Sequence, residues 1–287
     1  LKQQKLEKRR LEFKPFSLSC IIKVLELIGP IFFLLMSLLW ENKFNLEFES
    51  ITFNGGAGDK TCSGISDADL DIVVDKTSTG KVTFAGSCSF DEVTVTDGIF
   101  AITSNTVTAD NTVSIANNAE LEIGTGTFNA DATFNANSSG IIDFTDAGKL
   151  VLSSTVSSLG ALDDAAGTVE YDGGSQNVLA DAYYNLEIDQ SGTKTSQGTV
   201  TVAGNMTVQS AATYAVAATT TTVTGASDIN GTTSISTGTY NADGSSDVDG
   251  TISITGTGKY DADAAFDASS EWSSPSDIKK ITRLVWS

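Results

Sequence analysis

Apolar and polar residues alternate along most of the chain beyond residue 50. Short segments such as 82–84 (Val-Thr-Phe), 93–95 (Val-Thr-Val) and 112–115 (Thr-Val-Ser-Ile) alternate one apolar residue with one polar residue. Such a period of two is typical of β-strands with one buried and one solvated face. Clusters of Gly, Asn and Asp separate these segments, and these residues favour tight turns. The chain therefore predicts many short strands and an all-β fold.

A ten-residue phrase occurs three times: TGTFNADATF at 125–134, TGTYNADGSS at 237–246 and TGKYDADAAF at 257–266. The last two copies begin 20 residues apart. A fixed period of this length is typical of a solenoid, in which each repeat is one coil that needs its neighbours to bury its apolar side. Because stacked strands lie about 4.8 Å apart, about eleven coils of residues 51–274 would form a rod on the order of 50 Å long.

A second, longer repeat is superimposed on the first. The segments 51–53 and 82–84 recur as 169–171 and 200–202, an offset of 118 residues. The expected organisation is a parallel β-helix or β-solenoid over 44–274, with a duplicated module that spans 51–168 and 169–274. The alternative is a tandem of β-sandwich domains, because strands every 8–12 residues also suit a sandwich. The 20-residue period favours the solenoid.

Aromatic residues are expected to point inward and to stack at equivalent sites, where they fix a register that short Thr-rich strands specify poorly. The inward candidates are Phe53, Phe84, Phe100, Phe128, Phe134, Phe144, Tyr171, Tyr214, Tyr240, Tyr260 and Phe266.

The N-terminal region differs from the rest of the chain. Residues 21–40 are apolar apart from Lys23 and Glu26, and twenty helical residues span about 30 Å, the thickness of a bilayer core. Basic residues precede this segment, which predicts that the N-terminus stays in the cytoplasm and the body is exported. We expect residues 1–43 to be a basic N-terminus with a signal-anchor or transmembrane helix; the alternative is a cleaved signal peptide.

The body of the chain is strongly acidic. The net charge is −19, although the first 40 residues carry more basic than acidic groups. Phosphate contacts need clustered Lys and Arg, so we expect no nucleic acid among the partners. The end of the chain departs from this pattern, because 275–287 is basic and unlike a coil. We expect an atypical basic tail there, with the chain truncated.

The segments 183–188, 191–195 and 198–208 read YYNLEI, SGTKT and GTVTVAGNMTV. This run resembles the repeats of large secreted bacterial surface proteins, and the resemblance covers most of 51–268. It implies a β-helical, adhesin-like protein that is associated with the outer membrane or extracellular. Together with the N-terminal segment, this predicts an exported protein that is membrane-anchored, displayed on the cell surface or extracellular. The partners that we expect are the membrane, through the N-terminal segment, and surface polysaccharides or neighbouring cells.

The residue types available for chemistry are restricted. The chain has no His, which excludes Ser-His-Asp catalysis and imidazole metal ligands. We therefore expect a structural or adhesive module that is not an enzyme and needs no cofactor. The first alternative is a β-helix that binds or cleaves carbohydrate. The second is an ice-binding face built from Thr-rich strands such as 219–224 and 251–255, although their Thr rows keep no strict register on every coil.

Calcium is the one metal for which the sequence offers candidate ligands. Asp243, Asp247 and Asp249 supply carboxylate oxygens at alternating positions near Gly244 and Gly250, although the terminal Glu of a calcium loop is absent. Ordinary turn chemistry is the alternative explanation of the same residues. The body also contains Cys62 and Cys88, which either form a disulfide between adjacent coils or remain buried thiols.

Overall fold

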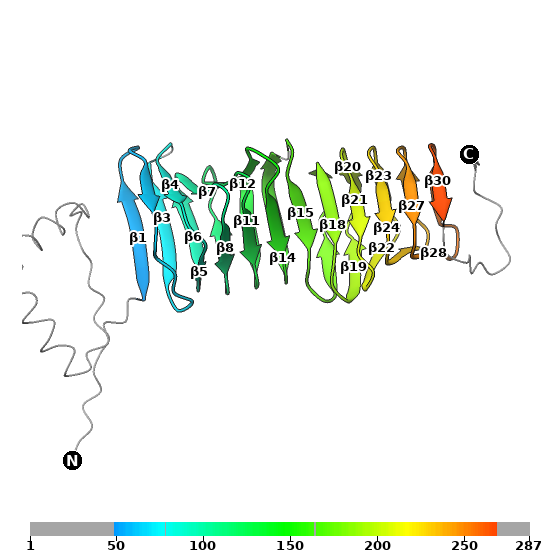
Figure 1. Cartoon of the computed structure of the whole chain (residues 1–287), viewed down its shortest axis with the longest axis horizontal. Coiled ribbons are helices and arrows are strands. Elements are labelled where there is room, and N and C mark those ends of the chain that lie inside the picture. The colour runs from blue at the N-terminus through cyan, green and yellow to red at the C-terminus, as the bar shows by residue number, and fades with distance from the viewer. Residues whose placement is uncertain (1–48, 78, 164, 269–287) are drawn as a thin grey trace, which may run out of the picture. The chain divides into compact units, whose positions relative to one another are not determined.

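The computed structural model describes residues 49–77, 79–163 and 165–268. These residues form a parallel β-solenoid of about eleven coils of roughly 20 residues, and the coils stack along one axis (Figure 1). The pairings between the described strands are parallel, which excludes the tandem of β-sandwiches, because sandwiches are built from antiparallel sheets. The expected membrane segment 21–40 and the basic tail 275–287 lie outside the described residues.

Four sheets make up the three faces of the coil. Sheet A contains β1 (Ser50–Gly55), β2 (Lys60–Cys62), β3 (Asp71–Lys76), β4 (Lys81–Phe84), β6 (Val93–Asp97), β7 (Ile99–Ile102), β9 (Val113–Ile115), β10 (Glu120–Ile123), β12 (Phe134–Phe144) and β14 (Val156–Asp163). Sheet B contains β5 (Cys88–Phe90), β8 (Thr106–Ala109), β11 (Thr127–Ala130), β13 (Lys149–Leu152), β15 (Thr168–Tyr171), β18 (Asn185–Ile188), β21 (Met206–Val208), β24 (Ser227–Ile229), β27 (Ser246–Val248) and β30 (Phe266–Ala268).

The C-terminal coils use two further sheets. Sheet C contains β16 (Gln176–Val178), β19 (Gly192–Ser196), β22 (Ala212–Val216), β25 (Thr232–Ile235) and β28 (Thr251–Ile254). Sheet D contains β17 (Ala182–Tyr183), β20 (Val200–Val202), β23 (Thr220–Val223), β26 (Thr239–Ala242) and β29 (Lys259–Ala262). Sheet A covers two faces of the N-terminal coils, because the long strand β12 pairs with both β9 and β10. Sheet B forms the third face from β5 to β30.

The alternation of apolar residues produces one continuous core. Strands such as β4 and β10 bury every second side chain, and the buried residues form a single cluster from Cys62 to Ala262. The prediction of inward aromatics is confirmed. Phe53 and Phe266, in the two terminal coils, are partly buried against the core, and the other nine candidates are buried. Phe90 and Tyr183 are also buried and were not predicted.

The core changes character along the solenoid. The N-terminal coils pack Phe rings against each other, as in the stacked pair Phe84 and Phe100 with centroids 4.3 Å apart. The C-terminal coils bury Tyr side chains that donate hydrogen bonds to buried Ser residues. The Tyr240 hydroxyl lies 3.0 Å from Ser227 Oγ, and the Tyr260 hydroxyl lies 2.8 Å from Ser246 Oγ. These two tyrosine hydroxyls therefore have partners, which avoids the cost of an unpaired polar group.

The repeated phrases do not all occupy the same face. The copy at 125–134 supplies β11 of sheet B, whereas the copies at 237–246 and 257–266 supply β26 and β29 of sheet D. Tyr240 and Tyr260 are paired in register and stacked, with centroids 5.0 Å apart. The phrase therefore encodes a strand with an inward aromatic and a turn, and does not by itself specify a face. The expected module boundary at 168/169 falls inside β15.

The two cysteines of the body are buried free thiols. The sequence left open whether Cys62 and Cys88 form a disulfide or remain buried thiols, and the structure has the buried thiols. Burial and the neighbouring Cys62 thiol raise the pKa of Cys88 to about 12, and burial also raises the pKa of Cys62. Both side chains consequently remain protonated at neutral pH, which makes them poor nucleophiles.

Candidate functional site

The regular stacking is interrupted on two of the three faces at the same level. Sheet A ends at β14, while sheet C begins at β16 and sheet D begins at β17. Sheet B continues across this level through the pairing of β15 with β18. Among the described strands, the ladder of sheet B is therefore the only one that joins the two halves of the solenoid at this sheet break (Figure 1).

The side chain of Gln176 replaces backbone pairing at the sheet break. Gln176 is buried, and its Nε2 donates to the carbonyl oxygens of Leu152, at 2.9 Å, and of Ser154. Its Oε1 accepts a hydrogen bond of 2.7 Å from the backbone N–H of Gly173. One amide thus satisfies three backbone groups, two of which belong to the preceding coil.

Two buried tyrosines join the coils beneath the sheet break. The hydroxyls of Tyr171 and Tyr183 lie 3.0 Å apart. The Leu179 N–H donates to the Tyr171 hydroxyl at 3.2 Å, and the Tyr183 hydroxyl donates to the Leu179 carbonyl at 2.9 Å. Burial raises the pKa of Tyr171 to about 12, so both rings act as neutral hydrogen-bonding groups across the physiological range.

A groove opens on the outer surface of the sheet break, with a volume of about 460 Å³. It lies between the segment that enters β14 and the segment that enters β16, and it extends onto β19. The lining residues are Ser153, Ser154, Thr155, Val156, Gly174, Ser175, Gln176, Asn177, Thr193 and Thr195. Eight of these ten residues carry a hydroxyl or amide side chain, and none carries a charge. The groove is therefore a neutral, hydrogen-bonding surface on an acidic protein.

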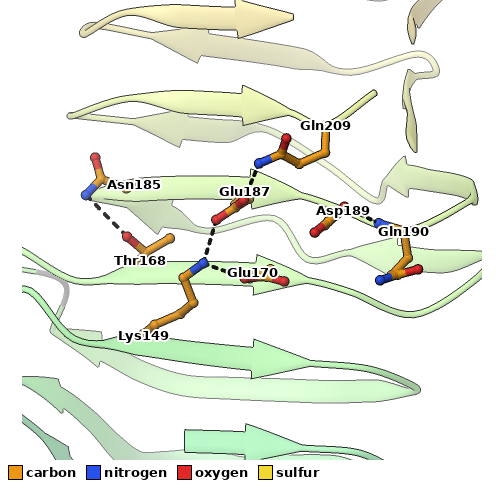
Figure 2. Close-up of polar contacts among 8 residues, drawn as sticks. All are labelled: Lys149, Thr168, Glu170, Asn185, Glu187, Asp189, Gln190 and Gln209. Carbon is orange, nitrogen blue, oxygen red and sulfur yellow. Dashed lines mark hydrogen bonds and ion pairs between the residues drawn. The ribbon is translucent and has the colours of Figure 1, made fainter. Parts of the chain in front are cut away.

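A charged network lies on the outer face of sheet B beside the sheet break (Figure 2). Lys149 Nζ lies 2.6 Å from Glu170 Oε2 and 2.7 Å from Glu187 Oε2, and Gln209 Nε2 donates to Glu187 Oε1 at 2.6 Å. Burial raises the pKa of Glu170, which is 7% exposed, although Lys149 opposes this. Burial would also raise the pKa of Glu187, but hydrogen bonds from Lys149 and Gln209 hold it below its usual value. The network ties four successive coils together, from β13 to the residue after β21.

Two groups of carboxylates in the described chain have oxygens within 4.8 Å of one another: Glu120, Glu122 and Asp143, and Glu170, Asp172 and Asp189. Each group already has a neighbouring cation, because Lys81 pairs with Glu122 and Lys149 pairs with Glu170. In the second group, the ammonium of the buried Lys194 also favours the charged form of Asp172. We assign these clusters to ion pairing.

The predicted calcium ligands lie after β26 and within or directly after β27 of the C-terminal coils. Asp243 follows β26 and accepts a hydrogen bond from Asn241 Nδ2 at 2.7 Å. Asp247 lies in β27, and Asp249 directly follows that strand. Neither of the two close carboxylate groups contains any of the three.

Asp247 belongs instead to an acidic column. It is paired in register with Asp228 of β24 and Asp267 of β30. Partial loss of hydration raises the pKa of Asp247, and so do the negative charges of Asp249, Asp228 and Asp267. The sequence could not reveal this column, because it depends on register between coils.

Sheet C carries a column of threonines on its outer face. Thr193, Thr213, Thr232 and Thr251 are paired in register on four consecutive strands. Two residues further along the same strands lie Thr195, Ala215, Ser234 and Ser253, which form a second column of small uncharged side chains. The pairings agree with the prediction that the Thr rows keep no strict Thr-x-Thr register on every coil, because among these four strands only β19 has Thr in both columns. The continuous first column was not predicted, because it depends on register between coils.

Buried and clustered carboxyls make stability depend on pH. Burial, with a contribution from at least one neighbouring carboxylate, raises the pKa of Asp71, Glu120, Asp131, Asp143, Glu170, Asp172 and Asp247. A carboxyl with a raised pKa binds its proton in the folded state first, so lowering the pH favours folding until the unfolded chain also protonates, near pH 4. Glu187 has the opposite effect on the pH dependence of stability. Its pKa is lowered in the folded state, so it contributes stability that is lost as the pH falls through that lowered value.

We therefore expect the melting temperature at low salt to rise as the pH falls from 7 toward 5. Added salt should raise the melting temperature at pH 7 and weaken its dependence on pH, because salt screens repulsion between exposed carboxylates. Calorimetry across this range checks both effects. A melting temperature that falls steadily from pH 7 to 5 would contradict the assignment.

Comparisons of the chain with protein-family models, with curated proteins and with solved structures find no match. Across residues 49–77, 79–163 and 165–268, no helix has the length and apolar character needed to cross a membrane.

Proposed function

We propose that this chain is an exported structural and adhesive rod, held at or released from the cell surface, whose solenoid presents binding faces and performs no catalysis. The continuous core through about eleven coils supports this proposal most strongly. Because each coil packs on its neighbours, the core stiffens the solenoid along its length, as a display module requires. The predominantly acidic surface favours solubility and weakens attraction to nucleic acids. The N-terminal apolar segment supplies the export signal.

Export and adhesion are tested separately on the full chain. A C-terminally tagged chain, expressed in a bacterial host, is expected to appear in the membrane or extracellular fraction, with its tag accessible to antibody on intact cells or in the medium. Beads coated with the purified chain should attach to cells or polysaccharide-coated surfaces more than beads coated with an acidic protein of equal charge. Retention in the cytosol would contradict export, and equal attachment of the two kinds of bead would contradict adhesion.

The Thr column of sheet C favours a second candidate function, the binding of ice. Its hydroxyl and methyl groups repeat about every 4.8 Å from coil to coil, which is the regularity that an ordered lattice of water requires. We expect the full chain to inhibit ice recrystallisation, and the variant Thr213→Arg/Thr232→Arg to lose this activity. Thr201→Arg, on the outer face of sheet D, is the matched control. Equal inhibition by both variants, or none by the unaltered chain, would eliminate this candidate.

A further inference from the structure

We propose that the groove at the sheet break binds neutral glycan chains. This inference rests on the proposed adhesive function and names its ligand class. The site is built by the break itself, since β14 and β16 leave a gap at their outer edge that Gln176 closes from beneath. Its volume of about 460 Å³ lies within the range of pockets that hold small organic ligands.

The lining selects the ligand by its hydrogen-bonding chemistry. Hydroxyl and carboxamide side chains both donate and accept hydrogen bonds, as the hydroxyls of a sugar do. Val156 is the only lining residue with a large apolar side chain, so an acyl chain or an apolar peptide would gain little from burial there. A charged ligand would lose its hydration without meeting an opposite charge in the groove.

Charges around the groove strengthen the preference for a neutral ligand. Asp172 and Asp189 occupy the turns that lead into the groove segments of β16 and β19. The lysines near them are already engaged: Lys149 contacts Glu170 and Glu187, and the buried Lys194 donates to the carbonyls of Asp189 and Gln190. An anionic glycan such as a polyuronate would therefore meet like charge at this end of the groove.

The groove also continues onto the outer face of sheet C, which is suited to bind a longer glycan chain. Thr193 and Thr195 line the groove and are the first members of the two columns on sheet C. A glycan that leaves the groove along the solenoid axis would meet further hydroxyl groups at Thr213 and Ser234. We therefore expect affinity to increase with chain length from the disaccharide to the hexasaccharide.

The test uses the full chain and defined oligosaccharides. The neutral probes are cello-, xylo-, manno- and maltohexaose, and the anionic probe is hexagalacturonic acid; binding is measured by calorimetry and by chemical-shift changes at amides 153–156, 174–177 and 193–195. At least one neutral probe is expected to bind, with shifts confined to these segments, whereas hexagalacturonic acid should not bind. Absence of binding by every neutral probe, preferential binding of the anionic probe, or shifts elsewhere would overturn the proposal.

Substitutions locate the site. Gly174→Leu places an aliphatic side chain in the groove, and a Cβ added there meets no atom within 4 Å, so the fold should tolerate it. Gly58→Leu is the matched control, because Gly58 is exposed with equal free space in the first coil. We expect at least a 10-fold loss of affinity in the first variant and none in the second. Equal affinities would overturn the assignment to the groove.

A second variant tests the hydroxyls without filling the groove. Thr193→Val/Thr195→Val keeps the shape of both side chains and favours the strand, and each lost hydrogen bond should reduce affinity about 3- to 10-fold. Unchanged affinity would contradict the role of these hydroxyls. If coated beads still attach to cells while the purified chain binds no neutral glycan, the adhesive function stands and the glycan proposal fails.

Discussion

Replacing Phe84 with Ala is expected to destabilise the N-terminal coils by about 3–5 kcal/mol, the largest effect of any single substitution considered. Phe84 is 1% exposed, and its ring contacts three others: Phe100 is stacked on it at 4.3 Å, and Phe90 and Phe53 meet it edge-on at 5.4 and 6.1 Å. Removal of the ring leaves a cavity that three coils line. Rigid stacked strands cannot collapse into it without losing their register.

The loss should be local, because each coil contacts mainly its neighbours. Hydrogen exchange is expected to accelerate in β2, β4 and β7, while β26 and β29 keep their protection. The matched control is Phe266→Ala, since Phe266 is partly exposed and stands in the last described coil, with Tyr260 5.9 Å away. Phe266→Ala should lower the free energy of unfolding clearly less than Phe84→Ala does, and it should accelerate exchange only in the C-terminal coils. Acceleration spread evenly over both ends would contradict a solenoid whose coils are coupled only to their neighbours.

The sequence was sufficient to predict the coil and its interior. A period of about 20 residues, combined with alternation inside each strand, places residues such as Phe100, Phe128 and Tyr214 on the inner face whatever the turn lengths are. The number of coils follows from the same period. These features depend on local patterns that each strand carries in its own residues.

The features that depend on register between coils were not predictable in the same way. The segment Thr193-Lys194-Thr195 contains no apolar residue, so the sequence pattern does not indicate which of its side chains points inward. Pairing with Tyr214 puts Lys194 inside, where its ammonium donates to the carbonyls of Asp189 and Gln190. The Thr column and the sheet break arise in the same manner, because turns of different lengths set which residues become neighbours.

Gln176 carried the one sequence signal that could have marked the sheet break. Its position in sheet C is occupied in the later coils by Lys194, Tyr214, Thr233 and Ile252. A Gln at an inward position, two residues after the Gly173-Gly174 pair, indicates a side chain that satisfies backbone groups rather than one that fills a core. The groove is then the outer side of the same interruption.

Gln176→Leu is therefore expected to weaken the connection between the two halves of the solenoid. The substitution keeps a side chain of similar size but leaves the carbonyls of Leu152 and Ser154 and the N–H of Gly173 without this partner. The Leu152 carbonyl keeps the N–H of Asp172 as a donor, at 3.0 Å, so the cost falls on the other two groups. A buried backbone group left unpaired costs about 1–3 kcal/mol. Because sheets A, C and D do not cross this level, the loss falls where the coils are joined by fewer strand pairings than elsewhere, namely the ladder of sheet B, with the tyrosine contacts and the Lys149–Glu187 ion pair beside it.

Urea denaturation followed by hydrogen exchange measures this effect, and the unfolding of coils before β15 and after β18 should separate into two transitions. Gln197→Leu is the matched control: Gln197 is exposed, and its amide contacts Asn177 at the surface, so a single transition should persist. Separation in both variants would mean that the coils are already uncoupled at this level. A single unshifted transition in Gln176→Leu would mean that sheet B and the tyrosines Tyr171 and Tyr183 suffice to couple the two halves. Two transitions confined to Gln176→Leu would show that one buried amide makes the solenoid unfold as a unit, although two of its three faces are interrupted.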